Sequence, residues 1–281
     1  MTADDFGLSW AVNEAVEQAV GAGVLTCASL MVGEKAAADA VSRARRLPQL
    51  RVGLHVVVAD GRPVLPPDEI PELCDEDGRL DGRLVRAGFR FVFNRRAARA
   101  LESEIRAQFA AFAATGLALD HVNAHKHMHL HPAVLGIILK VGGEYGMRAV
   151  RLPREPLQAA RSGSERRRWL LNLLVTGPWL RQMRWRLERA GMRHNDWVLG
   201  LSQSGAMDED AMLALLGDMP EGVTELYCHP ATQDGADVSP TGYRPVAEWQ
   251  ALMSTRVSAA LRARARPCAG FRDLAADGGV P

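Results

Sequence analysis

The chain has 281 residues, of which 47% are hydrophobic and 24% charged, with a net charge of +1. These values are typical of a globular protein with a sizeable core, and the near-neutral charge gives no general attraction for nucleic acid. The four cysteines lie far apart and form no CxxC pair, so the sequence predicts neither a zinc–thiolate site nor a disulfide framework. It contains neither a signal-peptide pattern nor an apolar run of about 18 residues, so we expect a cytoplasmic protein.

Short apolar runs typical of strands alternate with longer helical patterns along the chain. Strands are expected at 25–32, 51–58, 119–125, 148–152, 196–201 and 224–229, with a weaker one at 267–271. Helices are expected at 10–21 after the N-cap Ser9, and at 34–47, 97–115, 132–145, 208–216 and 244–264. Residues 61–86 are expected to form a long surface loop over the site.

This alternation predicts an α/β fold with a parallel sheet. Repeated strand–helix units over this length favour a single (β/α) barrel-like domain, similar to a TIM barrel and spanning 1–281. An open, doubly wound sheet is the alternative. In barrels the chemistry is found at the carboxyl ends of the strands, and polar residues fall there repeatedly. His55 comes late in its strand, while His125 and His229 end theirs.

Five of the eight histidines lie within eleven residues: His121, His125, His127, His129 and His131. In a strand, His121, Asn123 and His125 would share one face, whereas in a helix His125 and His129 would do so. Either arrangement can present imidazole to a divalent metal ion. The alternative is a solvated turn that happens to be rich in histidine.

Asp4 and Asp5 form a vicinal acid pair before the first helix. A metal-dependent hydrolase needs an anionic ligand and a separate base for water, and two neighbouring carboxylates can divide those tasks. Alternatively, one of them caps the helix. His55 is either a structural histidine within its apolar strand or a third ligand that completes a set of one carboxylate and two imidazoles. His229 is either a general acid for the leaving amine or a hydrogen-bonded core histidine.

Segments in order along nearly the whole chain resemble the YdjC-like carbohydrate deacetylases, also called the ChbG/HpnK family. They read TADDFGLS (2–9), GVLTCASLMV (23–32), VGLH (52–55), DHVNAHKHMHLHP (120–132), RLPREP (151–156) and ELYCHPA (225–231). Asn123 and Lys126 stand where the chitooligosaccharide branch of the family has Asp and His. This difference favours the branch associated with hopanoid biosynthesis, HpnK.

The resemblance implies a metal-dependent hydrolase that removes the N-acetyl group of an N-acetylglucosamine-type sugar, carried on a hopanoid glycolipid. It implies that a divalent metal ion, magnesium or zinc, is held by Asp5, His55 and His125. Asp4 would then be the general base and His229 the general acid. We further expect three residues to bind substrate: Asn123, His127 and Arg151.

Other functions remain open from the sequence: a deacetylase of chitooligosaccharides, another metal-dependent amidohydrolase or phosphoesterase, or a non-enzymatic metal-storage protein. One departure from the family concerns the start of the chain. Family members carry several apolar residues before ADDFG, so we expect the first strand to be incomplete here, with Asp4 and Asp5 on a frayed end.

A basic amphipathic insertion is expected at about 163–193. Its core, Arg166–Arg193, contains eight arginines and one acid, Glu188, interleaved with tryptophan and leucine. This composition is typical of an interfacial helix, so we expect peripheral contact with the inner membrane. The alternative is a barrel helix with a basic outer face. Gly177-Pro178 is expected to break the segment into two pieces.

Overall fold

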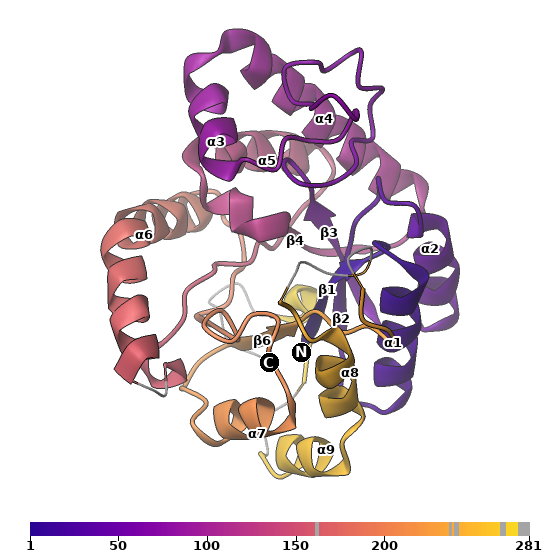
Figure 1. Cartoon of the computed structure of the whole chain (residues 1–281), viewed down its shortest axis with the longest axis vertical. Coiled ribbons are helices and arrows are strands. Elements are labelled where there is room, and N and C mark those ends of the chain that lie inside the picture. The colour runs from indigo at the N-terminus through magenta and orange to yellow at the C-terminus, as the bar shows by residue number, and fades with distance from the viewer. Residues whose placement is uncertain (161–162, 236–237, 239–241, 265–267, 275–281) are drawn as a thin grey trace.

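The computed structural model describes residues 1–160, 163–235, 238, 242–264 and 268–274. Within these residues, parallel strands form a six-stranded sheet in the order β4-β3-β2-β1-β6-β5 (Figure 1). Their bounds are β1 Thr2–Phe6, β2 Cys27–Leu30, β3 Arg51–Val56, β4 Leu119–Ala124, β5 Trp197–Leu199 and β6 Thr224–Cys228. The α/β class and the parallel sheet are therefore confirmed.

The first strand forms, and the expectation of a frayed end at Asp4 and Asp5 is wrong. β1 has only five residues, but it lies in the middle of the sheet and pairs with both β2 and β6. Pairing on both edges satisfies its backbone polar groups, so a short strand suffices. Every residue of β1 is buried.

The predicted strand at 148–152 forms single bridges instead of a regular ladder. Val150 pairs with Val122 of β4, and Ala149 pairs with Arg193 ahead of β5. Further on, the Val198 N–H of β5 donates to the Arg154 carbonyl at 2.7 Å. This seam joins the two edge strands of the sheet, so the fold is barrel-like, with six strands and an irregular closure. Pro153 and Pro156 cannot donate to a ladder, so regular pairing does not continue beyond Leu152.

Five predicted helices lie within a few residues of their expected positions. They are α1 Trp10–Gly21, α2 Ala37–Arg46, α4 Arg95–Ala114, α5 Pro132–Glu144 and α7 Glu209–Gly217. Ser9 caps α1, since its hydroxyl accepts the Val12 N–H at 3.3 Å. The helix expected at 244–264 divides into α8 Pro245–Met253 and α9 Thr255–Arg262. The division occurs because Ser254 is extended and caps α9 with its side chain.

Two helices differ from the prediction. α3, Leu84–Phe93, begins inside the segment expected to be a loop. α6, Gly163–Arg189, is one helix that contains Pro178, so the expected break at Gly177-Pro178 is wrong. Proline removes one helical hydrogen bond, and because this part of α6 is exposed, water can satisfy the freed carbonyl.

Short 3-10 turns complete the chain: η1 His125–Leu130, η2 Leu157–Ala159 and η3 Phe271–Asp273. The weak strand expected at 267–271 does not form in its described part, because Phe271 begins η3, while residue 267 lies outside the described residues. No helix in the described ranges has the length and hydropathy needed to cross a lipid bilayer.

Candidate active site

A bulge in β1 directs two neighbouring carboxylates into one site. Ala3 pairs with Ala28 and Phe6 with Leu30, so Asp4 and Asp5 together lie opposite the single residue Ser29. Asp5 has a φ of 61°, in the left-handed region. In a regular strand, adjacent side chains point to opposite faces, whereas a bulge re-aims one of them. The two acids can therefore act in one site, and neither caps α1.

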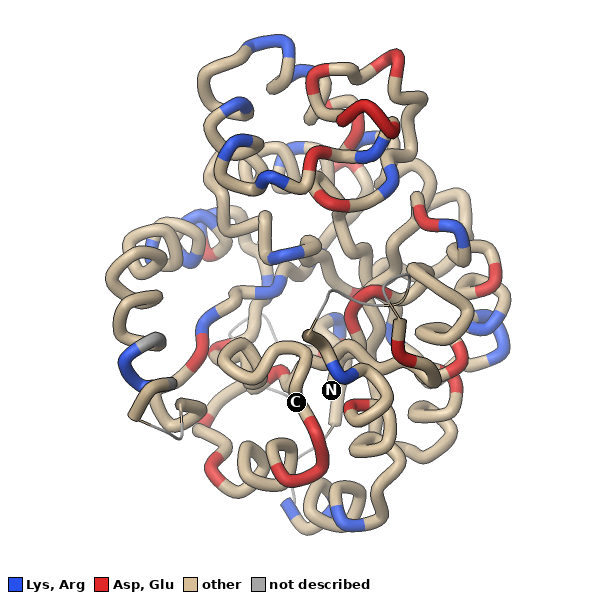
Figure 2. Tube along the Cα trace, in the orientation of Figure 1, with Lys and Arg blue, Asp and Glu red and all other residues tan. Residues whose placement is uncertain are grey.

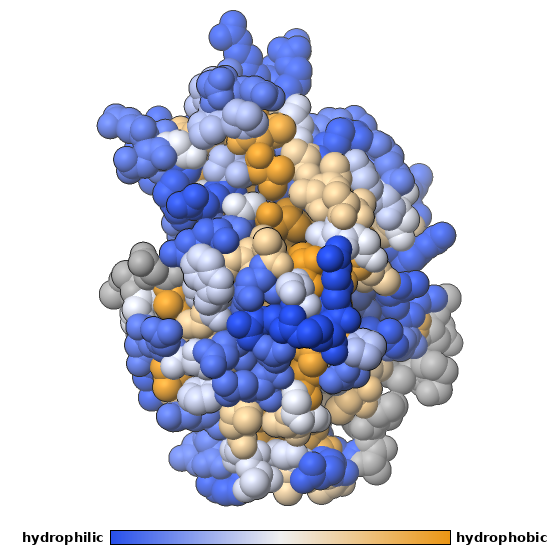
Figure 3. Space-filling model, turned by 90° about the vertical axis from the view of Figure 1, so that its right-hand side faces the viewer, coloured by the Kyte–Doolittle hydropathy of each residue, from blue (hydrophilic) through white to orange (hydrophobic). Residues whose placement is uncertain are grey.

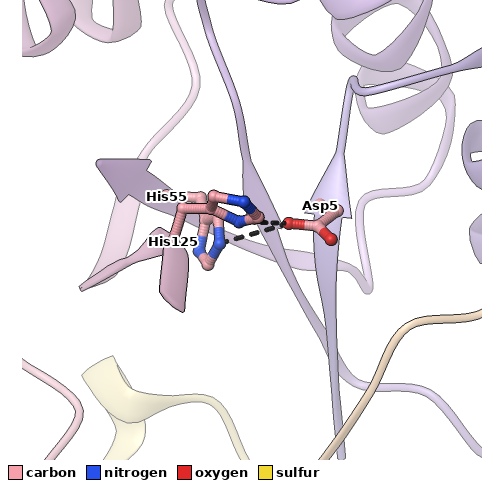
Figure 4. Close-up of side chains that lie close together, drawn as sticks. All are labelled: Asp5, His55 and His125. Carbon is pink, nitrogen blue, oxygen red and sulfur yellow. Dashed lines mark hydrogen bonds and ion pairs between the residues drawn. The ribbon is translucent and has the colours of Figure 1, made fainter. Parts of the chain in front are cut away.

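Asp5, His55 and His125 come together from β1, from β3 and from the turn after β4 (Figure 4). One potential ligand atom from each lies within 4.8 Å of the other two. Asp5 Oδ1 lies 3.3 Å from His55 Nε2 and 3.2 Å from His125 Nδ1. A carboxylate oxygen facing two ring nitrogens needs protons or a cation between them. One carboxylate and two imidazoles suit zinc or another divalent transition metal ion, with positions left open for water and substrate.

Asn123 fixes the orientation of His55. Its Oδ1 lies 2.6 Å from His55 Nδ1, and its Nδ2 donates to Asp4 Oδ1 at 3.1 Å and to Ser29 Oγ at 2.9 Å. A protonated His55 Nδ1 that donates to Asn123 leaves Nε2 directed at Asp5, the arrangement common for metal-bound histidine. Asn123 is fully buried with its amide occupied, so it supports the site from beneath and does not face the cavity.

A chain of buried hydrogen bonds continues from Asn123 to the C-terminal turn. Ser29 Oγ lies 3.0 Å from His121 Nε2, and His121 Nδ1 lies 2.8 Å from Asp120 Oδ2. Asp120 in turn accepts the backbone N–H of Phe271 at 3.0 Å. Ser29, His121 and Asp120 are at most 1% exposed. The orientation of His55 is thus connected to η3 at the other end of the sequence.

Glycines in two of the motifs leave room for this arrangement. Gly7 has a φ of 97°, and a Cβ there would lie 3.0 Å from the Met31 carbonyl oxygen. A Cβ on Gly53 would lie 2.5 Å from the ring of His121. Any side chain at Gly53 would displace His121 and disturb the hydrogen-bond chain.

Arg151 holds the other acid of the pair. Its guanidinium donates to Asp4 Oδ2 at 2.5 Å and Oδ1 at 2.9 Å, and to both oxygens of Glu225 at 2.8 and 2.7 Å. Burial raises the pKa of Asp4, but the attraction of Arg151 outweighs it, so the pKa lies well below its usual range. Arg151 is itself 0% exposed and lies over the Tyr227 ring. All three of its guanidinium nitrogens donate to these two carboxylates.

The chain is strained immediately after His125. Lys126 and His127 have φ values of 53° and 54°, and Asp60, which pairs with Lys126, has 53°. Together with Asp5, these are the non-glycine residues with positive φ in the described part of the chain. Such conformations cost about 1–3 kcal/mol each and persist where the surroundings impose them, commonly at functional sites.

His127 and His229 flank Tyr227 at the site. His127 Nε2 lies 3.5 Å from the Tyr227 hydroxyl, and the His229 ring lies 5.2 Å from that of Tyr227. Burial, and next the charge of Arg151, lower the pKa of His127 to about 3, so its ring is neutral at pH 7. The His229 backbone N–H donates to the buried carboxylate of Glu248 at 2.5 Å. His129 lies deeper, fully buried, and neither ring nitrogen has a partner among the described residues.

Most of the predicted site residues line one cavity of about 1360 Å³. Its lining includes Asp4, Asp5, His55, His125, His127 and His229. It does not include Asn123 or Arg151, which lie beneath. The opposite wall consists largely of α6, and Leu84 of α3 is the lining residue from the predicted loop 61–86. The site is therefore polar and buried at its floor and apolar along one wall.

Sequence reasoning missed several residues that support the site. Ser29 is a hydroxyl within the apolar run LTCASLMV, and it completes the hydrogen-bond chain. Glu225 and Tyr227 alternate with His229, and side chains at every second position of a strand share a face. That period, extended back from His229, was the signal that could have identified both residues.

The chain is similar to known proteins over most of its length. The family model described as "YdjC-like protein" matches residues 1–263. A carbohydrate deacetylase of Brevibacillus brevis is 32% identical over 244 residues, 86% of this chain and 85% of that protein. A carbohydrate deacetylase of Geobacillus stearothermophilus is 36% identical over 161 residues, 57% of this chain and 60% of the relative.

The fold also has a solved counterpart. A crystal structure from Enterococcus faecalis V583, named for cellobiose-phosphate cleavage, superposes with a TM-score of 0.72 and 25% identity. The superposition covers 96% of this chain and 95% of the other.

Proposed function

Since the chain belongs to the YdjC-like protein family, we propose that it is a metal-dependent carbohydrate deacetylase that hydrolyses an acetamido group on a sugar. The observation that carries the proposal is the convergence of Asp5, His55 and His125 beside a second carboxylate, Asp4, at the floor of a large cavity. One relative named a carbohydrate deacetylase matches most of the chain, and another matches somewhat more than half of it. Both support the same reaction class.

Asp5, His55 and His125 would hold the divalent ion. When bound, the ion supplies Lewis-acid chemistry, which polarises the amide carbonyl and makes water more acidic. Asn123 keeps His55 Nε2 directed at the ion site through its bond to Nδ1. Zinc and magnesium both remain candidates for the native ion, with the two imidazoles favouring zinc or another transition metal.

Asp4 is the proposed general base. It would take a proton from the attacking water while a bond forms between the water oxygen and the acetyl carbon. Arg151 and Asn123 hold both its oxygens in place. These contacts fix the position of the carboxylate, and they also lower its basicity.

His229 is the proposed general acid. As the carbon–nitrogen bond breaks, it would give a proton to the departing amine, and the products are acetate and an amino sugar. The neutral ring of His127 is better suited to hydrogen bonding with the substrate than to donating a proton, given its low pKa. Glu248, which accepts the His229 backbone N–H, positions the general acid.

A hopanoid glycolipid that carries N-acetylglucosamine is the proposed substrate. The cavity exceeds the range of about 300–1,000 Å³ usual for small-molecule sites. Apolar residues of α6, among them Trp169, Leu173 and Leu180, line its wall. An apolar aglycone would bury surface there. A chitooligosaccharide is the alternative substrate, because its sugars could fill the same volume.

Acetate release tests the proposal. Metal-loaded enzyme would be supplied with an N-acetylglucosaminyl hopanoid or with N,N′-diacetylchitobiose, beside Asp5→Asn and His125→Ala. We expect acetate from the wild type, faster with the lipid-linked sugar, and loss of both metal and activity in the variants. Full turnover in both variants would reject the site, whereas faster hydrolysis of the chitobiose would reject the hopanoid substrate alone.

A further inference from the structure

An exposed apolar stripe runs along α3. Val85, Phe89, Val92 and Phe93 are 74%, 62%, 57% and 78% exposed. Their spacing places them on one face of the helix, and the rings of Phe89 and Phe93 stack at 6.1 Å. Four large apolar side chains on a ten-residue helix are thus in contact with solvent, which is costly unless another surface covers them.

The neighbouring helix α6 has the same property over a greater length. Its exposed apolar residues are Leu170, Leu171, Leu173, Leu174, Val175, Trp179 and Trp185. Among the described side chains of α6, only Met183 and Leu187 are buried. Much of the apolar surface of this helix is therefore exposed to solvent or lines the cavity.

His131 connects the two helices. Its ring lies 6.1 Å from Phe91 of α3 and 5.6 Å from Trp179 of α6, with near-perpendicular planes in both pairs. Leu84 of α3 lines the same cavity as α6. The two helices therefore lie near one cavity, with α3 above α6 in the view of Figure 1.

Positive charge accompanies these apolar residues. α6 contains seven arginines and two glutamates, and one of the glutamates, Glu188, pairs with Arg184 at 2.7 Å. α3 contains two arginines and no acid, and basic residues recur along both helices in Figure 2. The side of the molecule away from α6 is mostly hydrophilic, with apolar residues in an interrupted band (Figure 3).

We propose that the exposed apolar residues of α3 and α6, with their arginines, form a docking surface for an anionic lipid bilayer. Tryptophan, phenylalanine and leucine beside arginine match the acyl–headgroup boundary of such a bilayer. A second copy of the chain fits less well, because a symmetric interface would oppose arginine to arginine. Docking by this surface would place the cavity mouth at the lipid boundary, whatever reaction the cavity performs.

Vesicle flotation tests the docking surface without any measurement of activity. The purified full chain is mixed at low salt with vesicles of phosphatidylcholine, or of phosphatidylcholine and phosphatidylglycerol. We expect flotation with the anionic vesicles, weaker binding at high salt and little binding to the neutral ones. Absence of wild-type binding to anionic vesicles at low salt would overturn the proposal.

Variants distinguish the docking surface from non-specific adhesion. Phe89→Ser with Phe93→Ser should weaken binding by ~10-fold or more, because the variant lacks two aromatic rings that would insert into the bilayer. Arg189→Glu should weaken binding to anionic vesicles by about fivefold or more. Trp10→Ser, at a residue 57% exposed on α1, is the matched control and should bind as the wild type does.

Two further outcomes would contradict the assignment. Equal binding by the double phenylalanine variant and the wild type, with both folded by circular dichroism, would exclude this surface. A wild-type dimer that the double variant abolishes, seen by light scattering without vesicle binding, would identify a second copy as the occupant of the surface.

Discussion

The floor of the cavity and its α6 wall differ in burial and in hydrogen bonding. At the floor, Asp4, Asn123 and Arg151 are at most 2% exposed and are joined by several hydrogen bonds each. Along α6, which supplies much of that wall, Leu174 and Val175 are 69% and 74% exposed. The fold therefore fixes the geometry of the floor, whereas α6 presents an exposed surface that an external partner can cover. Substitutions in these regions should affect different measurements.

The largest contrast should come from the two acids. Asp4→Asn and Asp5→Asn should each lower kcat/KM by at least ~10²-fold, the scale of a general base or of a ligand to a catalytic ion. Steady-state acetate release on a water-soluble acetamido sugar measures this. Leu171→Ser, on the exposed part of α6 and outside the cavity lining, should leave that rate within about twofold. If Leu171→Ser lowered kcat/KM as much as the two acid variants do, the floor and α6 would not differ in their roles as proposed.

The next effect concerns the support beneath the metal ligands. Asn123→Ala removes the acceptor for His55 Nδ1 and should weaken metal affinity by ~10–100-fold. Isothermal titration with zinc measures it. Ser29→Ala, which removes one acceptor of the Asn123 amide, should have a smaller effect. An unchanged affinity in Asn123→Ala would show that His55 is oriented without this contact.

Packing beneath the floor should show in stability. Gly53→Ala places a methyl group against the His121 ring and should lower the free energy of unfolding by about 1–3 kcal/mol. Chemical denaturation gives the value. Gly143→Ala is the matched control, since a Cβ there meets nothing within 4 Å and alanine favours a helix. If the two variants are equally stable, then His121 moves aside at little cost.

The smallest expected effect concerns pH and the anchoring of α3. Hydrogen bonds from Arg83 lower the pKa of Asp81 to about 2, and Arg90 of α3 also bonds to this carboxylate at 3.0 Å. A lowered pKa means that the charged form stabilises the fold above about pH 4, and this contribution is lost as the pH falls towards 2. Asp81→Asn should therefore cost about 1 kcal/mol or less at pH 7. Denaturation of both proteins at pH 7 and pH 3 should show the difference shrinking, and a constant difference would contradict this assignment.

Local signals predicted much of the fold because they act over a few residues. Ser9 as a cap and Pro132 as the first residue of α5 both follow from the backbone bonds free at a helix start. The parallel sheet followed from the alternation of strands and helices. α3 was missed because its apolar residues face solvent, so the usual relation between hydrophobicity and burial does not hold there.

The convergence of the proposed ligands could be predicted from the sequence. Which polar residues line the cavity and which lie beneath it could not. Asp5, His55 and His125 come together as the family resemblance implied. Asn123 and Arg151 were expected to contact substrate, yet both are buried below the cavity. A polar residue at a strand end can face the cavity or the interior, and only the tertiary structure decides between them. The bulge at Asp4 and Asp5 could likewise not be predicted from local sequence, because it depends on the register with β2.

The distance along the chain between the proposed ligands has a thermodynamic consequence. Asp5 and His125 are 120 residues apart, so the unfolded chain would rarely bring them together. An ion that binds this site would therefore bind the native state almost exclusively and shift the unfolding equilibrium by mass action. The melting temperature would then rise with the logarithm of the free ion concentration, and the supply of metal in the cell would help to determine how much of the protein survives.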